Sequence, residues 1–127
     1  MTPVGLLVAD AVFADESLQA QFTNRAYHGT VVWSWQQALL AAGLDRQLAR
    51  SDLPRDLRKR MLDLRTALWS AIDRTRSLSS SELWSWKYAA GHYSIEPFGL
   101  TPAQAAAPVD ESNAAQLWST VYLAIRR

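Results

Sequence analysis

The feature that most constrains the fold is a helical repeat of apolar residues in the middle of the chain. Five apolar side chains recur there at intervals of three or four residues, the spacing of one helix face: Leu57, Met61, Leu64, Leu68 and Ile72. Ser51 or Asp52 is a candidate cap, and Pro54 suits the first turn. The charged residues between them are spaced for i,i+4 pairs, such as Asp56 with Arg60, which favours a solvated face over a nucleic-acid patch.

Two other segments have helical spacing. One begins at Thr30 as a candidate N-cap, continues with Val31, Val32 and Trp35, and ends at Gly43 or Arg50. The other covers about residues 112–125 at the end of the chain. A shorter helical turn is expected around residues 17–22, so the pattern predicts three long helices and one short one.

Between the second and the last of these helices the period changes to two. Glu82, Trp84, Trp86 and Tyr88 alternate with Leu83, Ser85 and Lys87, which indicates extended chain. The sequence Ala89-Ala90-Gly91-His92 fits a turn, after which the chain returns through residues 93–95. We therefore expect a small β-hairpin near residues 82–96.

The composition is that of one domain without cofactor chemistry. The 127 residues carry 13 basic and 12 acidic side chains that are interspersed, which disfavours binding to nucleic acid. The lack of cysteine excludes thiolate metal sites and disulfides, and His28 and His92 lie 64 residues apart, so we expect no metal and no cofactor. No apolar stretch is long enough to span a membrane. Asp10 interrupts the apolar start and no basic residue precedes it, so a signal peptide is not expected. A cytoplasmic protein is expected.

An aromatic run marks the candidate site. Tyr27-His28-Gly29-Thr30-Val31-Val32-Trp33-Ser34-Trp35 leads into the first long helix, in a chain with six Trp, four Tyr and three Phe. Trp and Tyr offer flat apolar faces with a polar edge, which suit sugar rings, nucleobases and hydrophobic interfaces. The run either lines a pocket or packs beneath one.

Carboxylates among these aromatic residues are the candidate reactive groups. Glu82 and Glu96 are the only Glu residues in the aromatic-rich section, and a carboxylate beside indoles can act as acid or base on a glycosidic bond. Ser34, Ser70 and Ser85 lack the glycine-flanked turn of an acyl-transfer nucleophile. Composition alone favours the simpler alternative, in which Glu82 lies at the rim of the hairpin, His28 bonds to backbone and the Trp residues pack in the core.

Four segments in this order resemble the C-terminal part of glycoside hydrolases built on an (α/α) toroid. They are Tyr27-His28-Gly29-Thr30-Val31-Val32-Trp33, Ser81-Glu82-Leu83-Trp84, Pro97-Phe98-Gly99 and Ser112-Asn113-Ala114-Ala115-Gln116-Leu117-Trp118-Ser119. Glycogen-debranching amylo-α-1,6-glucosidases, family 63 α-glucosidases and trehalase-like enzymes are the nearest groups. The resemblance implies a mainly α fold of antiparallel helical hairpins over residues 1–127, with the hairpin near 82–96. It also implies that Glu82 is the catalytic base of an inverting mechanism, and that the sugar-binding residues are Tyr27, His28, Trp33, Trp84 and Gln116.

The resemblance extends over about residues 20–125 and only the last part of such an enzyme. An inverting hydrolase also needs a general acid, roughly 6.5–9.5 Å from the base, and no segment matches that motif. The expected function is therefore that of a segment of a glycoside hydrolase acting on α-linked glucosides, inactive alone. A slice of a toroid exposes apolar faces, which predicts a homo-oligomer or association with an upstream toroid segment. The alternative is a non-catalytic helical module that binds a partner protein or saccharide through an aromatic groove.

Overall fold

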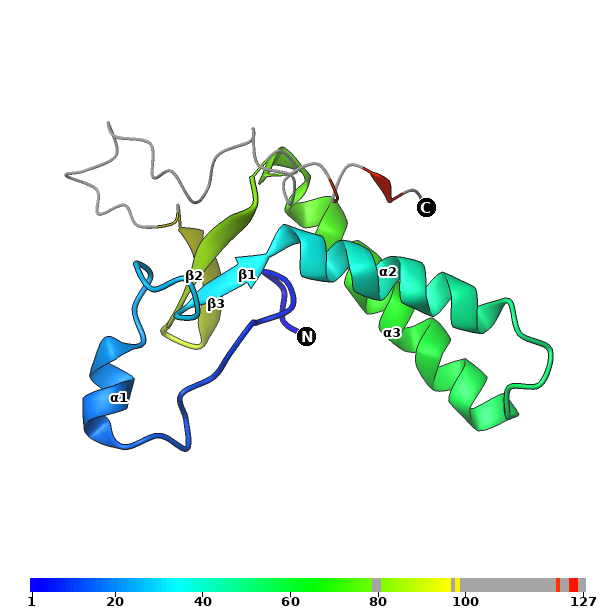
Figure 1. The fold of residues 1–127 in the computed structure, drawn as a ribbon, viewed down its shortest axis with the longest axis horizontal. Coiled ribbons are helices and arrows are strands. Elements are labelled where there is room, and N and C mark those ends of the chain that lie inside the picture. The colour runs from blue at the N-terminus through cyan, green and yellow to red at the C-terminus, as the bar shows by residue number, and fades with distance from the viewer. Residues whose placement is uncertain (79–80, 97, 99–120, 122–123, 126–127) are drawn as a thin grey trace.

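The protein is a small sheet from which a pair of long helices extends (Figure 1). The computed structural model describes residues 1–78, 81–96, 98, 121 and 124–125. In chain order the elements are α1 (Glu16–Gln21), β1 (Val31–Trp33), α2 (Ser34–Leu48), α3 (Arg55–Arg74), a 3-10 turn at Arg76–Leu78, β2 (Leu83–Ala89) and β3 (His92–Glu96). None of the helices in this described part is long and apolar enough to cross a bilayer.

The expected mainly α architecture is wrong. The described residues form a mixed α/β unit, in which a three-stranded antiparallel sheet in the order β1-β2-β3 accompanies the helices. Of the described helices only α2 and α3 are long, and they pack against each other and the sheet rather than forming a series of toroid hairpins. The third long helix, expected at about residues 112–125, falls almost wholly outside the described residues.

The start of the first long helix was also predicted incorrectly, because Val31–Trp33 form strand β1. Val31 pairs with Ser85, Val32 with Trp84 and Trp33 with Leu83. β-Branched side chains such as Val31 and Val32 favour the extended conformation when a neighbouring strand is present. Helix α2 therefore begins at Ser34, and it continues through Gly43 to Leu48.

Strands β2 and β3 confirm the hairpin predicted near residues 82–96. Tyr88 pairs with Tyr93 and Ala89 with His92, so Ala90 and Gly91 form a two-residue turn. Both turn residues have positive φ, 51° at Ala90 and 80° at Gly91. Two consecutive residues with positive φ are the requirement of a type I′ turn, which matches the twist of the flanking strands.

The turn makes Ala90 a site of local strain, since it is the one described residue other than glycine with positive φ. We expect Ala90→Gly or Ala90→Asn to raise the free energy of unfolding by about 0.5–1 kcal/mol, because both residues tolerate the left-handed region better than alanine. Urea unfolding measures the change. Ala89→Gly is the control, and it should destabilise because Ala89 belongs to β2. An unchanged or lower stability of both Ala90 variants would contradict the turn geometry.

The core lies on the face of the sheet that α2 and α3 cover. Trp84 is 1% exposed there, and its indole N–H donates to the Val4 carbonyl at 3.0 Å. The buried members of this cluster are Val32, Ala38, Ala41, Leu44, Leu68, Trp69, Ile72 and Trp84. A second, smaller cluster of Val31, Leu83 and Phe98 has Tyr27 and Trp33 packed against it. Because side chains alternate along a strand, the two clusters occupy opposite faces of the sheet.

Residues 4–8 extend the sheet beyond β1. The Val8 amide donates to the Val31 carbonyl at 3.2 Å, and Leu7 forms an isolated bridge with Val32. The Leu6 amide donates to Oε1 of Gln37, a buried side chain in the first turns of α2, at 3.1 Å. The edge of β1 that faces away from β2 is therefore paired with residues 7 and 8.

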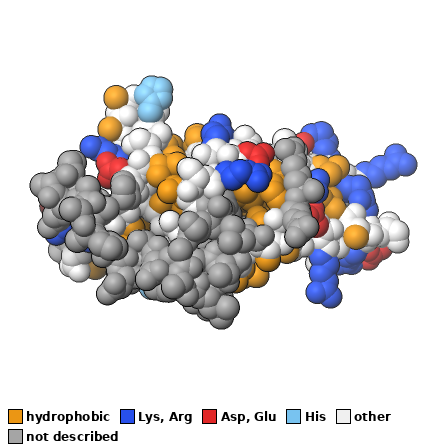
Figure 2. All heavy atoms as spheres, turned by 90° about the horizontal axis from the view of Figure 1, so that it is seen from above, with side chains coloured by type: hydrophobic (Ala, Val, Ile, Leu, Met, Phe, Trp, Pro, Cys, Tyr) orange, Lys and Arg blue, Asp and Glu red, His pale blue; other side chains and the backbone are white. Residues whose placement is uncertain are grey.

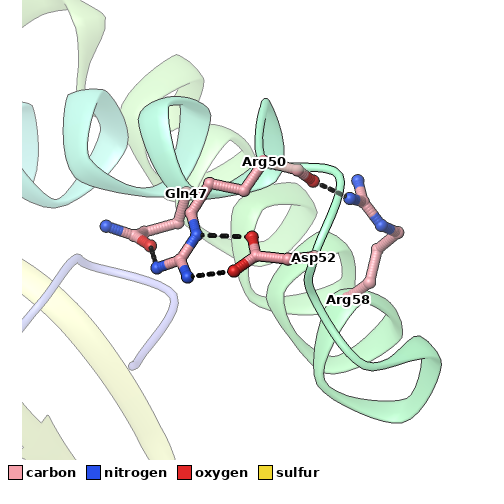
Figure 3. Close-up of polar contacts among 4 residues, drawn as sticks. All are labelled: Gln47, Arg50, Asp52 and Arg58. Carbon is pink, nitrogen blue, oxygen red and sulfur yellow. Dashed lines mark hydrogen bonds and ion pairs between the residues drawn. The ribbon is translucent and has the colours of Figure 1, made fainter.

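Arginine side chains hold the turn between α2 and α3 (Figure 3). Arg50 donates to both carboxylate oxygens of Asp52, at 2.9 and 2.6 Å, and to Gln47 Oε1 at 3.1 Å. The hydrogen bond from Arg50 holds the pKa of Asp52 below its usual value. From the first turns of α3, Arg58 donates to the carbonyls of Leu48, at 2.7 Å, and Arg50. The last carbonyls of a helix lack intrahelical partners, so Arg58 caps the C-terminus of α2.

Loss of this cap should be measurable. We expect Arg58→Met to lower the free energy of unfolding by about 1–2 kcal/mol, because two carbonyls lose a charged donor while the aliphatic stem is retained. Lys59→Met is the matched control, since Lys59 is exposed and its one ion pair among the described residues is with Asp63, a contact worth about 0.5 kcal/mol or less. Equal losses in the two variants would contradict the capping role.

Candidate functional site

The centre of the candidate site is a buried carboxylate, Glu82, which directly precedes β2. Its side chain is 1% exposed, and the Tyr27 hydroxyl donates a hydrogen bond to Oε1. The two residues are 55 positions apart in the sequence, so the fold brings them together. Oε2 is also buried, and among the described residues no donor reaches it. A buried carboxylate oxygen without a donor is costly, so a hydroxyl or amide donor that reached this atom would satisfy it.

Ser34 fixes the backbone of Glu82. The Ser34 amide donates to the Glu82 carbonyl at 2.8 Å, and its hydroxyl lies 2.8 Å from the carbonyls of both Ser81 and Glu82. The residues around Ser34 exclude it as an acyl-transfer nucleophile and give no local sign of this positioning role. Ser34 directly follows β1 and Glu82 directly precedes β2, so correct pairing of these strands would have revealed the contact.

Four rings form a continuous group beside the carboxylate, and we call Tyr27, His28, Trp33 and Trp35 the aromatic cluster. Ring centroids are 5.1 Å apart for Tyr27 and Trp33, 5.1 Å for His28 and Trp33, and 5.3 Å for Tyr27 and His28. Trp35 stacks on Trp33 at 5.3 Å with an interplanar angle of 18°. The Trp33 indole N–H also donates to the Tyr27 carbonyl at 3.2 Å. His28 is exposed and the other three rings are partly buried, so the cluster reaches the surface.

The loop before β1 gives Tyr27 its position. The Gly29 amide donates to the Ala26 carbonyl at 2.7 Å, and the Thr30 amide donates to the Thr23 carbonyl at 3.1 Å. A Cβ atom at Gly29 would lie 1.9 Å from the Thr23 carbonyl oxygen, which no side chain tolerates. The glycine in the Tyr27-His28-Gly29 sequence is therefore a requirement of this tight loop.

Of the other residues assigned to the sugar pocket, Trp84 lies elsewhere in the fold. Trp84 belongs to the core under α2 and α3, on the opposite face of the sheet from Trp33. Its indole therefore supports the sheet and is not part of the aromatic cluster. Gln116 lies outside the described residues. Glu96, the other glutamate near the aromatic residues, lies in β3 opposite Ser85.

No protein-family model, curated protein or solved structure matches this chain. Within the part of the chain that the structure describes, no three His, Asp or Glu side chains gather as a metal site would require. What Glu82 and the aromatic cluster offer is one buried acceptor group with apolar ring faces close by.

Proposed function

We propose that the chain binds a neutral carbohydrate of the α-linked glucoside class at the aromatic cluster, with Glu82 as the acceptor of a sugar hydroxyl. The observation that carries the proposal is the pairing of Glu82 with Tyr27 at the inner end of this cluster. One carboxylate oxygen is occupied by the Tyr27 hydroxyl, and the other has no donor among the described residues.

The chemistry of a sugar complements both parts of this site. A pyranose ring presents apolar C–H faces, which pack on aromatic rings, and hydroxyl groups, which donate to carboxylates. A hydrogen bond to a charged acceptor contributes about 1.5–3 kcal/mol, more than a neutral pair does. The Glu82 carboxylate would repel a phosphate group, which favours an uncharged ligand over a phosphorylated one.

Binding without turnover is proposed for the chain by itself. Glu82 has the residue type and the aromatic surroundings of the catalytic base in the glycosidases that the sequence resembles. Inversion at a glycosidic carbon needs a second carboxyl group to protonate the leaving oxygen, and the sequence contains no segment that matches the acid motif. The toroid architecture is not part of this proposal.

The proposal is tested by calorimetric titration with maltose and trehalose. We expect weak binding, with a Kd in the millimolar range, or roughly −4 kcal/mol. Glu82→Gln should raise the Kd about tenfold, because an amide is a weaker acceptor than a carboxylate. Tyr27→Phe should also weaken binding, because Glu82 then loses the hydroxyl that positions its carboxylate. Glu96→Gln, a change of the same type on β3, is the matched control and should leave the Kd unchanged.

Two results would contradict the proposal. One is a lack of binding by a chain whose circular dichroism shows it to be folded, and the other is an equal Kd for Glu82→Gln and the unmodified protein. Release of glucose from maltose, if it vanished in Glu82→Gln, would instead contradict the claim that this chain binds without turnover.

A further inference from the structure

An exposed apolar arm at one end of the molecule has few contacts with the rest of it. The arm consists of residues 9–21, which include α1, and no residue of α1 is buried. Phe13 is 100% exposed, Val12 63% and Leu18 53%. Large apolar side chains this exposed and this close together mark an interaction surface more often than a free one.

The arm is also acidic. Residues 1–24 contain Asp10, Asp15 and Glu16 and no Lys or Arg. Asp15 caps α1 and Asp10 bonds to the Val12 amide, whereas Glu16 is exposed and forms no ion pair among the described residues. A surface that binds the arm should therefore combine apolar side chains with available positive charge.

The opposite end of this same molecule has that combination. We call residues 45–65 the basic tip, which comprises the α2–α3 turn and the helix ends beside it; it carries seven Lys or Arg residues against four Asp. Figure 2 shows the Lys and Arg side chains gathered at this end, with apolar side chains among them. Leu57 is 41% exposed and Leu64 is 37% exposed. Arg60 follows Leu57 by three residues and precedes Leu64 by four, so the three share one stripe of α3.

The arginine in this stripe is available for a partner. Arg50, Lys59 and Arg65 pair with Asp residues of the tip, and Arg58 caps α2. Arg60 forms no ion pair within the described part of the chain. The stripe of Leu57, Arg60 and Leu64 thus matches the arm in both respects, an exposed apolar surface and a free charge of opposite sign.

From this complementarity we infer that a second copy of the chain docks its arm on the basic tip. Figure 1 places α1 and the α2–α3 turn at opposite ends of the long axis. Two copies side by side in antiparallel orientation therefore make the contact twice, arm on tip at each end, related by a two-fold axis. Such an arrangement closes on itself, whereas a single head-to-tail contact would continue into a filament.

The test is the solution mass of the full chain by light scattering over a dilution series. The expected result is a mass twice the 14.2 kDa of one chain at high concentration, which falls on dilution and on addition of salt. Phe13→Ser should raise the dissociation constant at least about tenfold, as loss of an apolar anchor does. Tyr88→Ser removes an aromatic ring that is 58% exposed on β2 and is the matched control, with no expected change.

A charge exchange tests the pairing of the two surfaces. Arg60→Glu and Glu16→Arg should each weaken the dimer, and the double variant should restore it, because the opposite charges then meet again. The residues replaced in these variants are all exposed, so the variants should remain folded; they are Phe13, Glu16, Arg60 and Tyr88. A monomer at every concentration would overturn the inference. So would a dimer that Phe13→Ser and Arg60→Glu leave intact, or one that Tyr88→Ser dissociates.

Discussion

Replacing Trp84 with alanine is expected to lower the free energy of unfolding by about 3–5 kcal/mol, the usual cost of deleting a buried indole. Trp84 is 1% exposed between the sheet and the two long helices. The substitution also removes the donor that satisfies the Val4 carbonyl at 3.0 Å. Small domains have about 5–15 kcal/mol of stability in total, so the variant should be partly or fully unfolded at 37 °C.

Urea unfolding followed by circular dichroism measures this loss. Trp33→Ala is the matched control, because it removes the same side chain from the other face of the sheet, where the ring is only partly buried. We expect it to cost about 1–2 kcal/mol and to weaken sugar binding. A Trp84→Ala variant that stays folded but loses sugar affinity would overturn the assignment of Trp84 to the core.

Gly29→Ala should destabilise the protein strongly although it adds only one methyl group. The new Cβ would lie 1.9 Å from the Thr23 carbonyl oxygen and 3.0 Å from both Cβ and the carbonyl oxygen of Ala26. The closest of these atoms belongs to the backbone, so the loop that positions Tyr27 has to move. We expect a loss of about 2–3 kcal/mol in the free energy of unfolding, together with weaker sugar binding.

The same change from glycine to alanine within α2 should instead raise the free energy of unfolding. A Cβ at Gly43 would meet no atom within 4 Å, and alanine is favoured over glycine inside a helix by about 0.5–1 kcal/mol. Gly43→Ala should therefore raise the midpoint of urea unfolding while Gly29→Ala lowers it. Equal midpoints for the two variants would mean that the loop before β1 is less tightly packed than the structure indicates.

The parts of the fold that the sequence predicts correctly are those with a local signal. Helix α3 has a sustained apolar repeat, and the β2–β3 hairpin has both the alternation and a Gly91 turn. Strand β1 was missed because Val31 and Val32 fit the start of a helical pattern as well as a strand. Its three residues are extended because β2 lies beside them, and that pairing joins positions at least 50 residues apart.

The candidate site was predicted in part. The aromatic run identified Tyr27, His28 and Trp33, which the structure brings together, but it gave no means of telling pocket indoles from core indoles. Trp84 follows Glu82 by two residues, yet its neighbours are helical side chains that no local pattern reveals. The Tyr27–Glu82 hydrogen bond itself depends on the β1–β2 register, so it could be found only after the fold was known.

The hydrogen bond from Trp84 to the Val4 carbonyl also sets an order of events during synthesis. The two residues are 80 positions apart, and at about 5–20 residues per second the ribosome needs roughly 4–16 s to add them. Helices α2 and α3 follow each other in the sequence between Ser34 and Arg74, so neither needs a distant segment in order to pack against the other. The helix pair can therefore form on the nascent chain first, while the Val4 carbonyl waits for its indole donor until β2 emerges.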